Sequence, residues 1–388
     1  MAVARSARPP LWRDVRVLRA VLQALFVAIV AGLLYYLFDN LRVNLHNRGL
    51  RTDFGFLDQP AGFQIAGSDF RSTQTVSDAL RVGVRNTASL AVVGVVLTTI
   101  LGVVVGIARL SGNWLVRKAA TFYVETLRNI PPVLVVIFTF TVVVLGLPRI
   151  QEAREVGRVL VLSNREVAVA WLDAGDGTGA FLLALLAGLA VAVAVGWWRT
   201  RRWNATGRPH HRVLWGLGVV VAFGVVAWLA LGGPVRVTLP DAEGLGVTGG
   251  VGMKGAYVAM LVALVAYTAS HVAEIVRGSI QAVPRGQVEA STALGLSEFQ
   301  RLRYVVLPQA FRIAIPPLIN QYLNLLKNTS LAVAIGFPEI TQLGRIVVGN
   351  GNPAPQVIAI TMGVYLCFSL VISALTNVVN RRLQVVSR

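Results

Sequence analysis

The apolar segment 313–326 and the residues just after it carry polar side chains at helical spacing. Asn320, Asn324 and Lys327 or Asn328 recur at three- and four-residue steps, so a helix places them on one face. A polar group that faces lipid is left without a hydrogen-bond partner, which costs several kcal/mol. This face therefore either joins neighbouring helices or lines a water-filled path. The candidate path residues are Asn320, Gln321, Asn324, Lys327, Asn328, Thr329 and Ser330.

Ionisable residues lie at the ends of two other apolar runs. His271, Glu274 and Arg277 lie three residues apart where one run ends, and Glu125 and Arg128 precede another. Ionisable side chains close to a membrane are typical of a gate or a solute exit. The alternative is an intrahelical ion pair of Glu274 with Arg277, worth a few tenths of a kcal/mol. The same two interpretations apply to Glu125 and Arg128.

No pattern of a catalytic, nucleotide or metal site is present in the sequence. Gly244, Gly246 and Gly249 form a GxGxxG pattern that no helix of a soluble domain follows. The chain lacks a GxxxxGK[ST] loop for ATP phosphates, and we find no nucleophile paired with a base. His210 and His211 have neither cysteine nor carboxylate neighbours, which argues against a metal site. We therefore expect a protein that is not an enzyme and holds no cofactor or metal of its own.

The composition places these residues in a membrane protein. Of 388 residues, 55% are apolar and 14% charged, with a mean hydropathy of +0.65. A soluble domain has about 25% charged residues. A net charge of +18 can indicate a nucleic-acid partner, but membrane proteins also concentrate Lys and Arg on their cytoplasmic side. The positions of the charges therefore decide between these two explanations. Cys367, the single cysteine, excludes an intrachain disulfide.

Eight apolar stretches lack Asp, Glu, Lys and Arg, and most approach the roughly 20 residues that cross a bilayer. We expect an all-α, polytopic fold of about eight spans. The first stretch has no small-residue cleavage site after it, which favours an uncleaved anchor over a signal peptide. The stretches are 20–38, 87–108, 130–147, 181–198, 213–231, 255–273, 313–326 and 357–376.

The positions of the charges predict the orientation. With a cytoplasmic N-terminus, the inside segments hold 22 basic and 5 acidic residues, and the outside segments hold 14 and 13. Lys and Arg concentrate on the cytoplasmic side of membrane proteins. We therefore expect both termini in the cytoplasm, and no nucleic-acid partner. The outside segments 39–86 and 148–180 are mixed in charge and rich in turn formers, so we expect them to be ordered but irregular.

Small residues predict where helices approach closely. Gly102 and Gly106 form a GxxxG pattern, and small residues continue at four-residue steps from Ala184 to Gly196. The connection 199–212 between two later spans is strongly basic. We expect those two spans to form a peripheral hairpin that meets anionic lipid.

The longest inside segment predicts a helix, a stop and a second helix. Residues 287–294 favour a short helix that Gly295 closes in the left-handed conformation. Ser297 followed by Gln300 is a capping box for the next helix, which Pro308 is expected to end. This arrangement indicates a docking element for a cytoplasmic partner. On its second helix, Phe299, Leu302 and Val306 fall on one apolar face. The same helix carries the basic residues Arg301 and Arg303.

This segment resembles the coupling loop of importer-type ABC transporter permeases. The signature of that loop is Glu-Ala-Ala, three residues, Gly, nine residues, Ile, one residue and Leu-Pro. Stretches 273–278, 325–331 and 128–132 resemble the polar amino acid uptake subfamily, although Asn328 stands where that subfamily more often has Asp. The residues at the signature positions are Glu289, Ala290, Ser291, Gly295, Val305, Leu307 and Pro308, with Ser291 in place of the second Ala and Val305 in place of Ile.

The resemblance implies a conduit subunit of a multi-pass bacterial inner-membrane transporter, with a five-span core and docking residues that couple it to an ATPase. The extended layout resembles the larger permease of general L-amino acid, or glutamate, glutamine, aspartate and asparagine, uptake systems. The implied partners are a second homologous permease, two copies of a cytoplasmic ATPase that binds ATP and Mg, a periplasmic amino acid binding protein and membrane lipid. An amino acid substrate needs donors for its carboxylate and acceptors for its ammonium, and Lys327 with the amides supplies both.

The resemblance also divides the chain. Residues 1–79 would form the anchor and a periplasmic loop, 80–147 the first part of the core, and 148–252 an insertion with an extra hairpin. Residues 253–388 would complete the core and include the coupling loop 285–308. The alternative function is an ion-coupled carrier or channel that acts alone. That class needs carboxylates within the spans as ion relays, and the eight stretches lack them.

Overall fold

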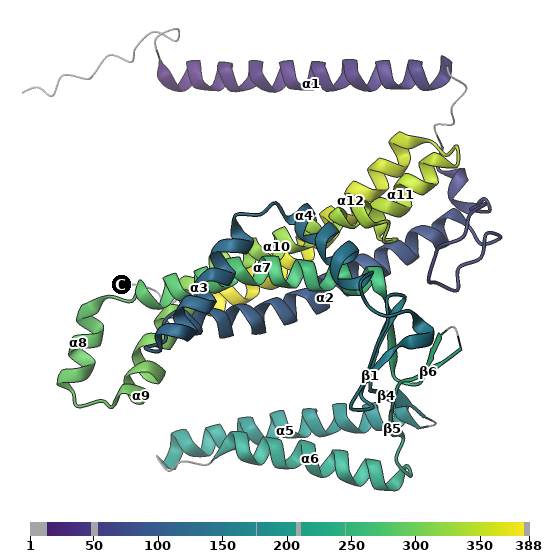
Figure 1. The fold of residues 1–388 in the computed structure, drawn as a ribbon. Helices are drawn as coiled ribbons and strands as arrows, with labels where there is room; N and C mark the ends of the chain where they lie inside the picture. The colour runs from purple at the N-terminus through teal and green to yellow at the C-terminus, as the bar shows by residue number, and fades with distance from the viewer. Residues whose placement is uncertain (1–13, 48–52, 176, 207–210, 245, 384–388) are drawn as a thin grey trace, which may run out of the picture. The chain divides into compact units, whose positions relative to one another are not determined.

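The computed structural model describes residues 14–47, 53–175, 177–206, 211–244 and 246–383. The chain forms two compact units. The first holds the described residues of Met1–Val84 together with Ile340–Phe368, and the second those of Arg85–Glu339 together with Ser369–Arg388. Helices dominate both units (Figure 1).

The expected helical membrane fold is confirmed. Within the described ranges, six helices are long and apolar enough to cross a membrane, or up to eight if two bent helix pairs each count as one span. One of these pairs, α3 with the helical run that begins at α4, bends by 105°. The helices are α1 (Val15–Asn47), α2 (Val76–Ala108), α3 (Trp114–Arg128), α4 (Pro132–Phe138), α5 (Thr178–Thr206), α6 (Arg212–Ala230), α7 (Gly255–Gln281), α8 (Arg285–Ala293), α9 (Glu298–Arg301), α10 (Leu307–Asn328), α11 (Ile340–Gly349) and α12 (Ala354–Leu383).

The expectation of an irregular outside segment at 148–180 was wrong, because strands form there. A four-stranded antiparallel sheet has the order β1-β2-β3-β8, and two ribbons pair β4 with β5 and β6 with β7. Each strand has only three or four residues, which is too few for an alternating pattern to be recognised in the sequence. Four of the eight strands follow α5 and α6 in the chain, so their partners are distant in sequence. The strands are β1 (Arg154–Val156), β2 (Leu160–Leu162), β3 (Glu166–Val169), β4 (Trp171–Ala174), β5 (Val235–Thr238), β6 (Asp241–Glu243), β7 (Gly246–Thr248) and β8 (Val251–Lys254).

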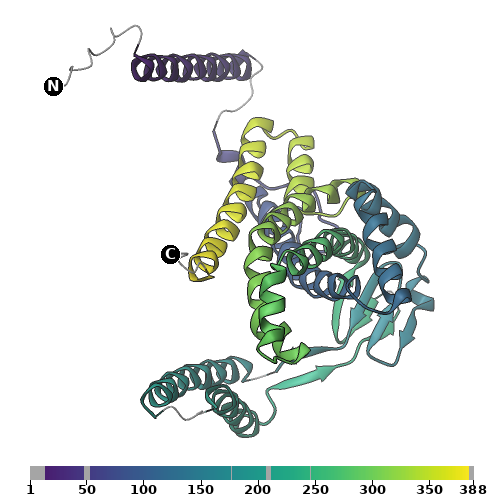
Figure 2. The same ribbon diagram turned by 90° about the vertical axis from the view of Figure 1, so that its left-hand side faces the viewer.

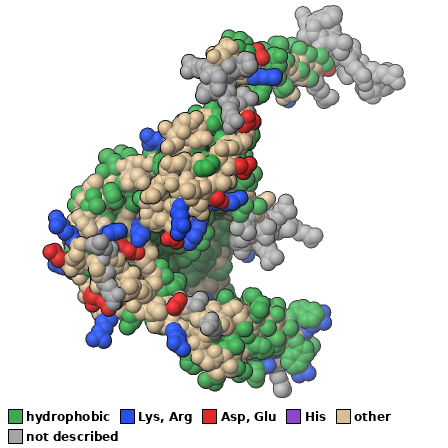
Figure 3. Space-filling view, turned by 90° about the vertical axis from the view of Figure 1, so that its right-hand side faces the viewer, with side chains coloured by type: hydrophobic (Ala, Val, Ile, Leu, Met, Phe, Trp, Pro, Cys, Tyr) green, Lys and Arg blue, Asp and Glu red, His purple; other side chains and the backbone are tan. Residues whose placement is uncertain are grey.

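Helices α5 and α6 form a hairpin that lies between β4 and β5 in the chain. They run side by side in Figures 1 and 2. A Cβ atom added at Gly188 would lie 2.7 Å from Cβ of Phe223, so the absence of a side chain there lets the two helices approach closely. The outward side chains of the hairpin are apolar and exposed (Figure 3).

The core of the second unit forms around α7. Leu90 of α2, Val136 of α4 and Leu264 of α7 are buried together with Phe337. A Cβ atom at Gly106 would lie 2.8 Å from the carbonyl oxygen of Ala273, which confirms the close packing that the GxxxG pattern predicted. Helices α3, α4 and α10 also contact α7, and α7 therefore positions the residues of the candidate site.

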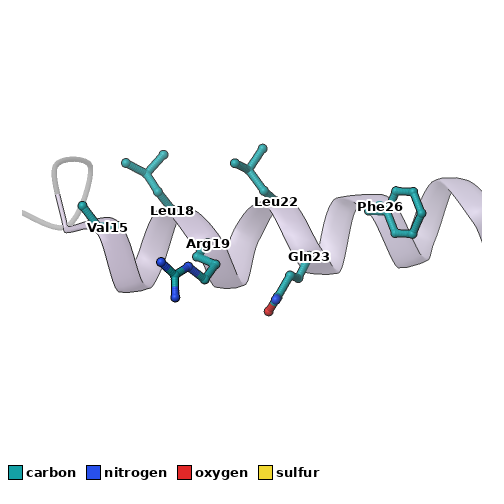
Figure 4. Close-up of a pocket in the computed structure, with 6 residues that line it drawn as sticks. All are labelled: Val15, Leu18, Arg19, Leu22, Gln23 and Phe26. Carbon is teal, nitrogen blue, oxygen red and sulfur yellow. The ribbon is translucent and has the colours of Figure 1, made fainter. Parts of the chain in front are cut away.

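The first unit has its own core, made by the start of α2, by α11 and by the start of α12. Val76 and Leu80 are buried there against Ile340 and Leu343. Helix α1 has exposed apolar side chains along its length. The hollow shown in Figure 4 is lined by six side chains of α1 alone, so it is a groove on one helix surface and encloses no site.

Candidate functional site

A polar pocket of about 220 Å³ lies between α7 and α10. Gln321, Asn324 and Asn328 reach it from α10, at steps of three and four residues along one helix face. Pro132, at the start of α4, closes one side. The residues that line it from α7 are Tyr267, Thr268 and His271.

The α7 side of the pocket is held in place by local contacts. The ring centroids of Tyr267 and His271 are 4.8 Å apart, and Nδ1 of His271 lies 3.2 Å from the backbone oxygen of Tyr267. The hydroxyl oxygen of Thr268 is buried and has no hydrogen-bond partner among the described atoms. A buried hydroxyl without a partner is costly, and a polar solute or water in the pocket would satisfy it.

The pocket lining is polar and holds one imidazole, one phenol, one hydroxyl and three carboxamides. Three carboxamides supply both donors and acceptors. None of the lining residues is Asp, Glu, Lys or Arg. Such a lining fits a small solute that carries donors and acceptors and no large net charge.

One turn further along α7, a carboxylate meets three guanidinium groups. Glu274 accepts hydrogen bonds from Arg109, which follows α2, and from Arg277 of α7. Arg128, the last residue of α3, lies 3.9 Å from the same carboxylate. The intrahelical pair expected from the sequence is present, but it is one part of a cluster that joins three helices and has an excess of positive charge.

The docking element has the predicted stop and start. Helix α8 ends in two closing hydrogen bonds, from the amide of Gly295 to Thr292 (2.9 Å) and from Leu296 to Ser291 (3.2 Å). Gly295 has φ +73°, in the left-handed region that glycine adopts without strain. The expected capping box of Ser297 with Gln300 opens α9.

The docking element is fixed at its base and exposed at its tip. Val306 is buried with Val283 and Ala310, which joins the element to the ends of α7 and α10. Leu294 and Phe299 are 80% and 68% exposed, respectively. These large apolar side chains, next to basic residues, form a surface suited to a protein partner.

The prediction that Pro308 ends the second helix was wrong. The chain stays helical from α9 into α10 through a π-helical turn at Leu302–Val306. Proline has no amide hydrogen for the α-helical ladder, and the wider turn just before Pro308 changes the hydrogen-bonding register at that point. Pro308 therefore lies in the first turn of α10, a position that tolerates proline.

A protein-family model matches most of this membrane chain. The family model "Binding-protein-dependent transport system inner membrane component" matches residues 98–385. The chain belongs to this family.

Relatives of this permease match along almost the whole chain. It is 39% identical over 372 residues to the putative amino-acid ABC transporter permease protein YhdX of Escherichia coli, covering 94% of each chain. It is 39% identical over 368 residues to the general L-amino acid transport system permease protein AapQ of Rhizobium johnstonii, covering 94% of this chain and 92% of AapQ. The glutamate/glutamine/aspartate/asparagine transport system permease protein BztB of Rhodobacter capsulatus is 32% identical over 409 residues, with coverage of 97% and 96%.

The family assigns the role of the chain. The permease is a multi-pass protein of the bacterial plasma membrane and the membrane subunit of an ATP-driven importer. It is not itself an enzyme, because ATP is hydrolysed by a separate ATPase subunit. ATPase and substrate-binding partners are general to the family.

The structure brings together some of the predicted site residues of the permease and separates others. Gln321, Asn324, Asn328 and His271 line the pocket, and Asn320 is exposed outside its lining. Among the other predicted residues, Lys327 and Glu125 are exposed. Thr329 is buried, and its hydroxyl donates to the backbone oxygen of Leu326. The Ser330 hydroxyl donates to the backbone oxygen of Lys327. In the docking element, Glu289, Ala290 and Pro308 are exposed and Leu307 is half-buried, whereas Ser291 is buried.

Sequence reasoning missed four residues of this region. Tyr267 and Thr268 precede His271 by one turn within an apolar stretch, and that spacing was a usable signal. Arg109 is the first basic residue after its span, but nothing in the sequence pairs it with Glu274. Glu339 is fully buried, with its carboxylate 3.5 Å from the hydroxyl of Thr87, although charge counting placed it in an outside loop.

Proposed function

We propose that the permease conducts polar amino acids and that the pocket between α7 and α10 is a station on their path. The observation that carries the proposal is the pocket lining, in which Gln321, Asn324 and Asn328 face His271 without a charged neighbour in the lining. Amides both donate and accept, so the same groups serve an ammonium, a carboxylate and a side-chain amide. The substrates in the names of AapQ and BztB support this class of solute.

The other α10 residues that the sequence predicted for the path lie outside this pocket lining. Lys327 and Asn320 are exposed on α10 beside pocket residues in the chain. We assign Lys327 to the approach of the solute, where an ammonium would attract a carboxylate through a charge-assisted contact. Thr329 and Ser330 belong to the turn that follows α10, and their hydroxyls bond to its last carbonyls.

The proposed assembly places this chain in a larger complex. A second homologous permease would complete the path, two copies of an ATPase would bind the docking elements, and a periplasmic protein would deliver the amino acid. The exposed Leu294 and Phe299 support the contact with the ATPase. In this proposal, residues 80–147 and 253–388 form the permease core, and 148–252 are an insertion.

The test compares two asparagines of one helix in proteoliposomes that contain the assembled transporter and its binding protein. We measure ATP-dependent uptake of radiolabelled glutamine by Asn324→Leu, whose side chain lines the pocket, and by Asn320→Leu, whose side chain does not. Loss of a hydrogen bond to a polar solute costs about 1–3 kcal/mol, so we expect uptake by Asn324→Leu to fall about 5- to 150-fold. Asn320→Leu should keep most of its uptake.

Two results would contradict the proposal. Equal uptake by both variants would place the path away from the pocket. Uptake driven by an ion gradient in the absence of ATP would favour the carrier mechanism instead.

A further inference from the structure

The imidazole of His271 is held against its own helix by one edge of the ring. Its Nδ1 lies 3.2 Å from the backbone oxygen of Tyr267 and 3.3 Å from the hydroxyl oxygen of Ser270. Ser270 is fully buried, and its hydroxyl already donates to the same backbone oxygen at 2.6 Å. A hydroxyl has one hydrogen to donate, so Ser270 can only accept from the imidazole. Both neighbours of Nδ1 are therefore acceptors.

These contacts determine which tautomer of the ring is present. A nitrogen that faces two acceptors must carry a hydrogen, so Nδ1 is the protonated nitrogen. An imidazole is mostly neutral at neutral pH, and its other nitrogen then has a bare lone pair. Nε2 makes no hydrogen bond with a residue of the described ranges. Because His271 is half-buried and lines the pocket, the ring edge with Nε2 is left for a solute.

This acceptor differs from the other polar groups of the lining. The carboxamides of Gln321, Asn324 and Asn328 make no hydrogen bond with a described residue, so each can turn its oxygen or its amino group to a solute. A hydroxyl can likewise donate or accept. Nε2 of the assigned tautomer can only accept. The part of a solute that lies against His271 must therefore be a hydrogen-bond donor.

We propose that His271 binds the α-ammonium group of the amino acid through Nε2 and makes the pocket selective for solutes that carry an amine. This role rests on the proposed function, because it belongs to the same pocket. An ammonium group has only donors, and a hydrogen bond from a charged donor is about twice as strong as one between neutral groups. A carboxylate has only acceptors and would meet the lone pair of Nε2 without a hydrogen between them. The carboxylate and the side-chain amide of a solute such as glutamine are then left to the carboxamides of α10.

The first measurement determines the tautomer by nuclear magnetic resonance. The permease is labelled with ¹⁵N-histidine and assembled with unlabelled partner subunits in nanodiscs. The chain has four histidines, and the background His46→Gln/His210→Gln/His211→Gln leaves His271 as its only one. A ring nitrogen with a hydrogen and a bare ring nitrogen have well-separated resonances, and we expect one of each. Glutamine should shift the bare resonance, whereas glutaramate, which is glutamine without its α-ammonium group, should leave it unchanged.

The second measurement compares the affinities of the two solutes. Radiolabelled glutamine is bound to the assembled transporter in the absence of its binding protein, and unlabelled glutamine or glutaramate displaces it. In the parent, glutamine should be effective at an about 10- to 150-fold lower concentration than glutaramate. His271→Leu, which removes the acceptor, should abolish this preference. His271→Gln, whose amide oxygen can accept in place of Nε2, should keep most of it, and the control His211→Leu at the start of α6 should keep all of it.

The results distinguish a wrong role for His271 from a wrong path. If Asn324→Leu weakens glutamine binding while His271→Leu weakens binding of glutamine and glutaramate equally, the pocket holds the solute but His271 does not bind its ammonium group. Two protonated ring nitrogens would show an imidazolium, which cannot accept from an ammonium group, and would also overturn the proposed role. Glutamine binding that neither Asn324→Leu nor His271→Leu changes would contradict the proposed function and, with it, the role of His271.

Discussion

Arg109 and Glu274 form an ion pair that joins the end of α2 to α7, one turn from the pocket. The Arg109 side chain is 11% exposed and that of Glu274 27% exposed, so the pair is partly withdrawn from water. Arg277 and Arg128 share the same carboxylate. Glu274 is thus the only acidic partner for three cations in the described ion pairs of this cluster.

Glu274→Gln should destabilise the permease. The substitution keeps the shape of the side chain but removes its negative charge. The guanidinium groups of Arg109, Arg128 and Arg277 then repel one another without a carboxylate between them. Breaking a buried ion pair costs about 3–5 kcal/mol, and the partial exposure here lowers the expected cost to about 2 kcal/mol. The measurement is the thermal unfolding midpoint of the purified protein. Glu298→Gln is the control, because its side chain is 92% exposed and 3.8 Å from Arg301. A midpoint equal to that of the control would show that the cluster contributes nothing to stability.

Gly295→Val should uncouple the transporter. The position has φ +73°, which a β-branched residue adopts only with strain. No atom lies within 4 Å of a Cβ placed there, so the effect comes from the backbone and not from a clash. We expect loss of transport and of substrate-stimulated ATP hydrolysis while the protein stays in the membrane. Gly295→Asn, which tolerates this conformation, should keep most of the activity. Full coupling in Gly295→Val would contradict the assignment of 285–308 to the ATPase contact.

Removal of the α5–α6 hairpin should affect stability and assembly more than substrate choice. The ends of the hairpin already meet, because the amide of Gly175 donates to the carbonyl of Pro234 at 3.0 Å. Replacing residues 175–234 by Asn-Gly would therefore join β4 to β5 in a two-residue hairpin. Competition of unlabelled amino acids against glutamine uptake measures the substrate range. An altered range in an assembled deletion variant would place the hairpin in the path.

The sequence predicted the elements that depend on local chemistry. The left-handed Gly295 and the capping box at Ser297 require only neighbouring residues, and both are present. The pocket lies on the predicted polar helix, and of the candidate path residues Gln321, Asn324 and Asn328 line it, whereas Asn320 and Lys327 lie outside its lining. A stripe of polar residues defines a helix face only to within about one position, and the packing of α7 decides which side is enclosed.

Longer-range pairings could not be predicted from the sequence. The sheet pairs Glu166 with Lys254 across the whole α5–α6 insertion, and no local pattern encodes that partner. Arg109 and Glu274 are 165 positions apart in the chain, so no local pattern could predict that they pair. The effect of Pro308 was predicted wrongly because the π-helical turn at Leu302–Val306, which accommodates the proline, is not visible in the sequence. That turn ends at Val306, whose burial against Val283 and Ala310 is a tertiary contact.

The most direct test of the path is thiol labelling of the assembled transporter in proteoliposomes. The native Cys367 is exposed, so the background carries Cys367→Ser. Single cysteines replace Asn324 and Gln321 in the pocket, and Leu318 and Tyr322 outside its lining. We predict that Asn324→Cys and Gln321→Cys react with a small hydrophilic thiol reagent and become protected in one nucleotide state, while the other two positions do not change with nucleotide. Inert cysteines at 321 and 324 in every state, with reactive ones at 318 and 322, would show that α10 presents another face to the solute.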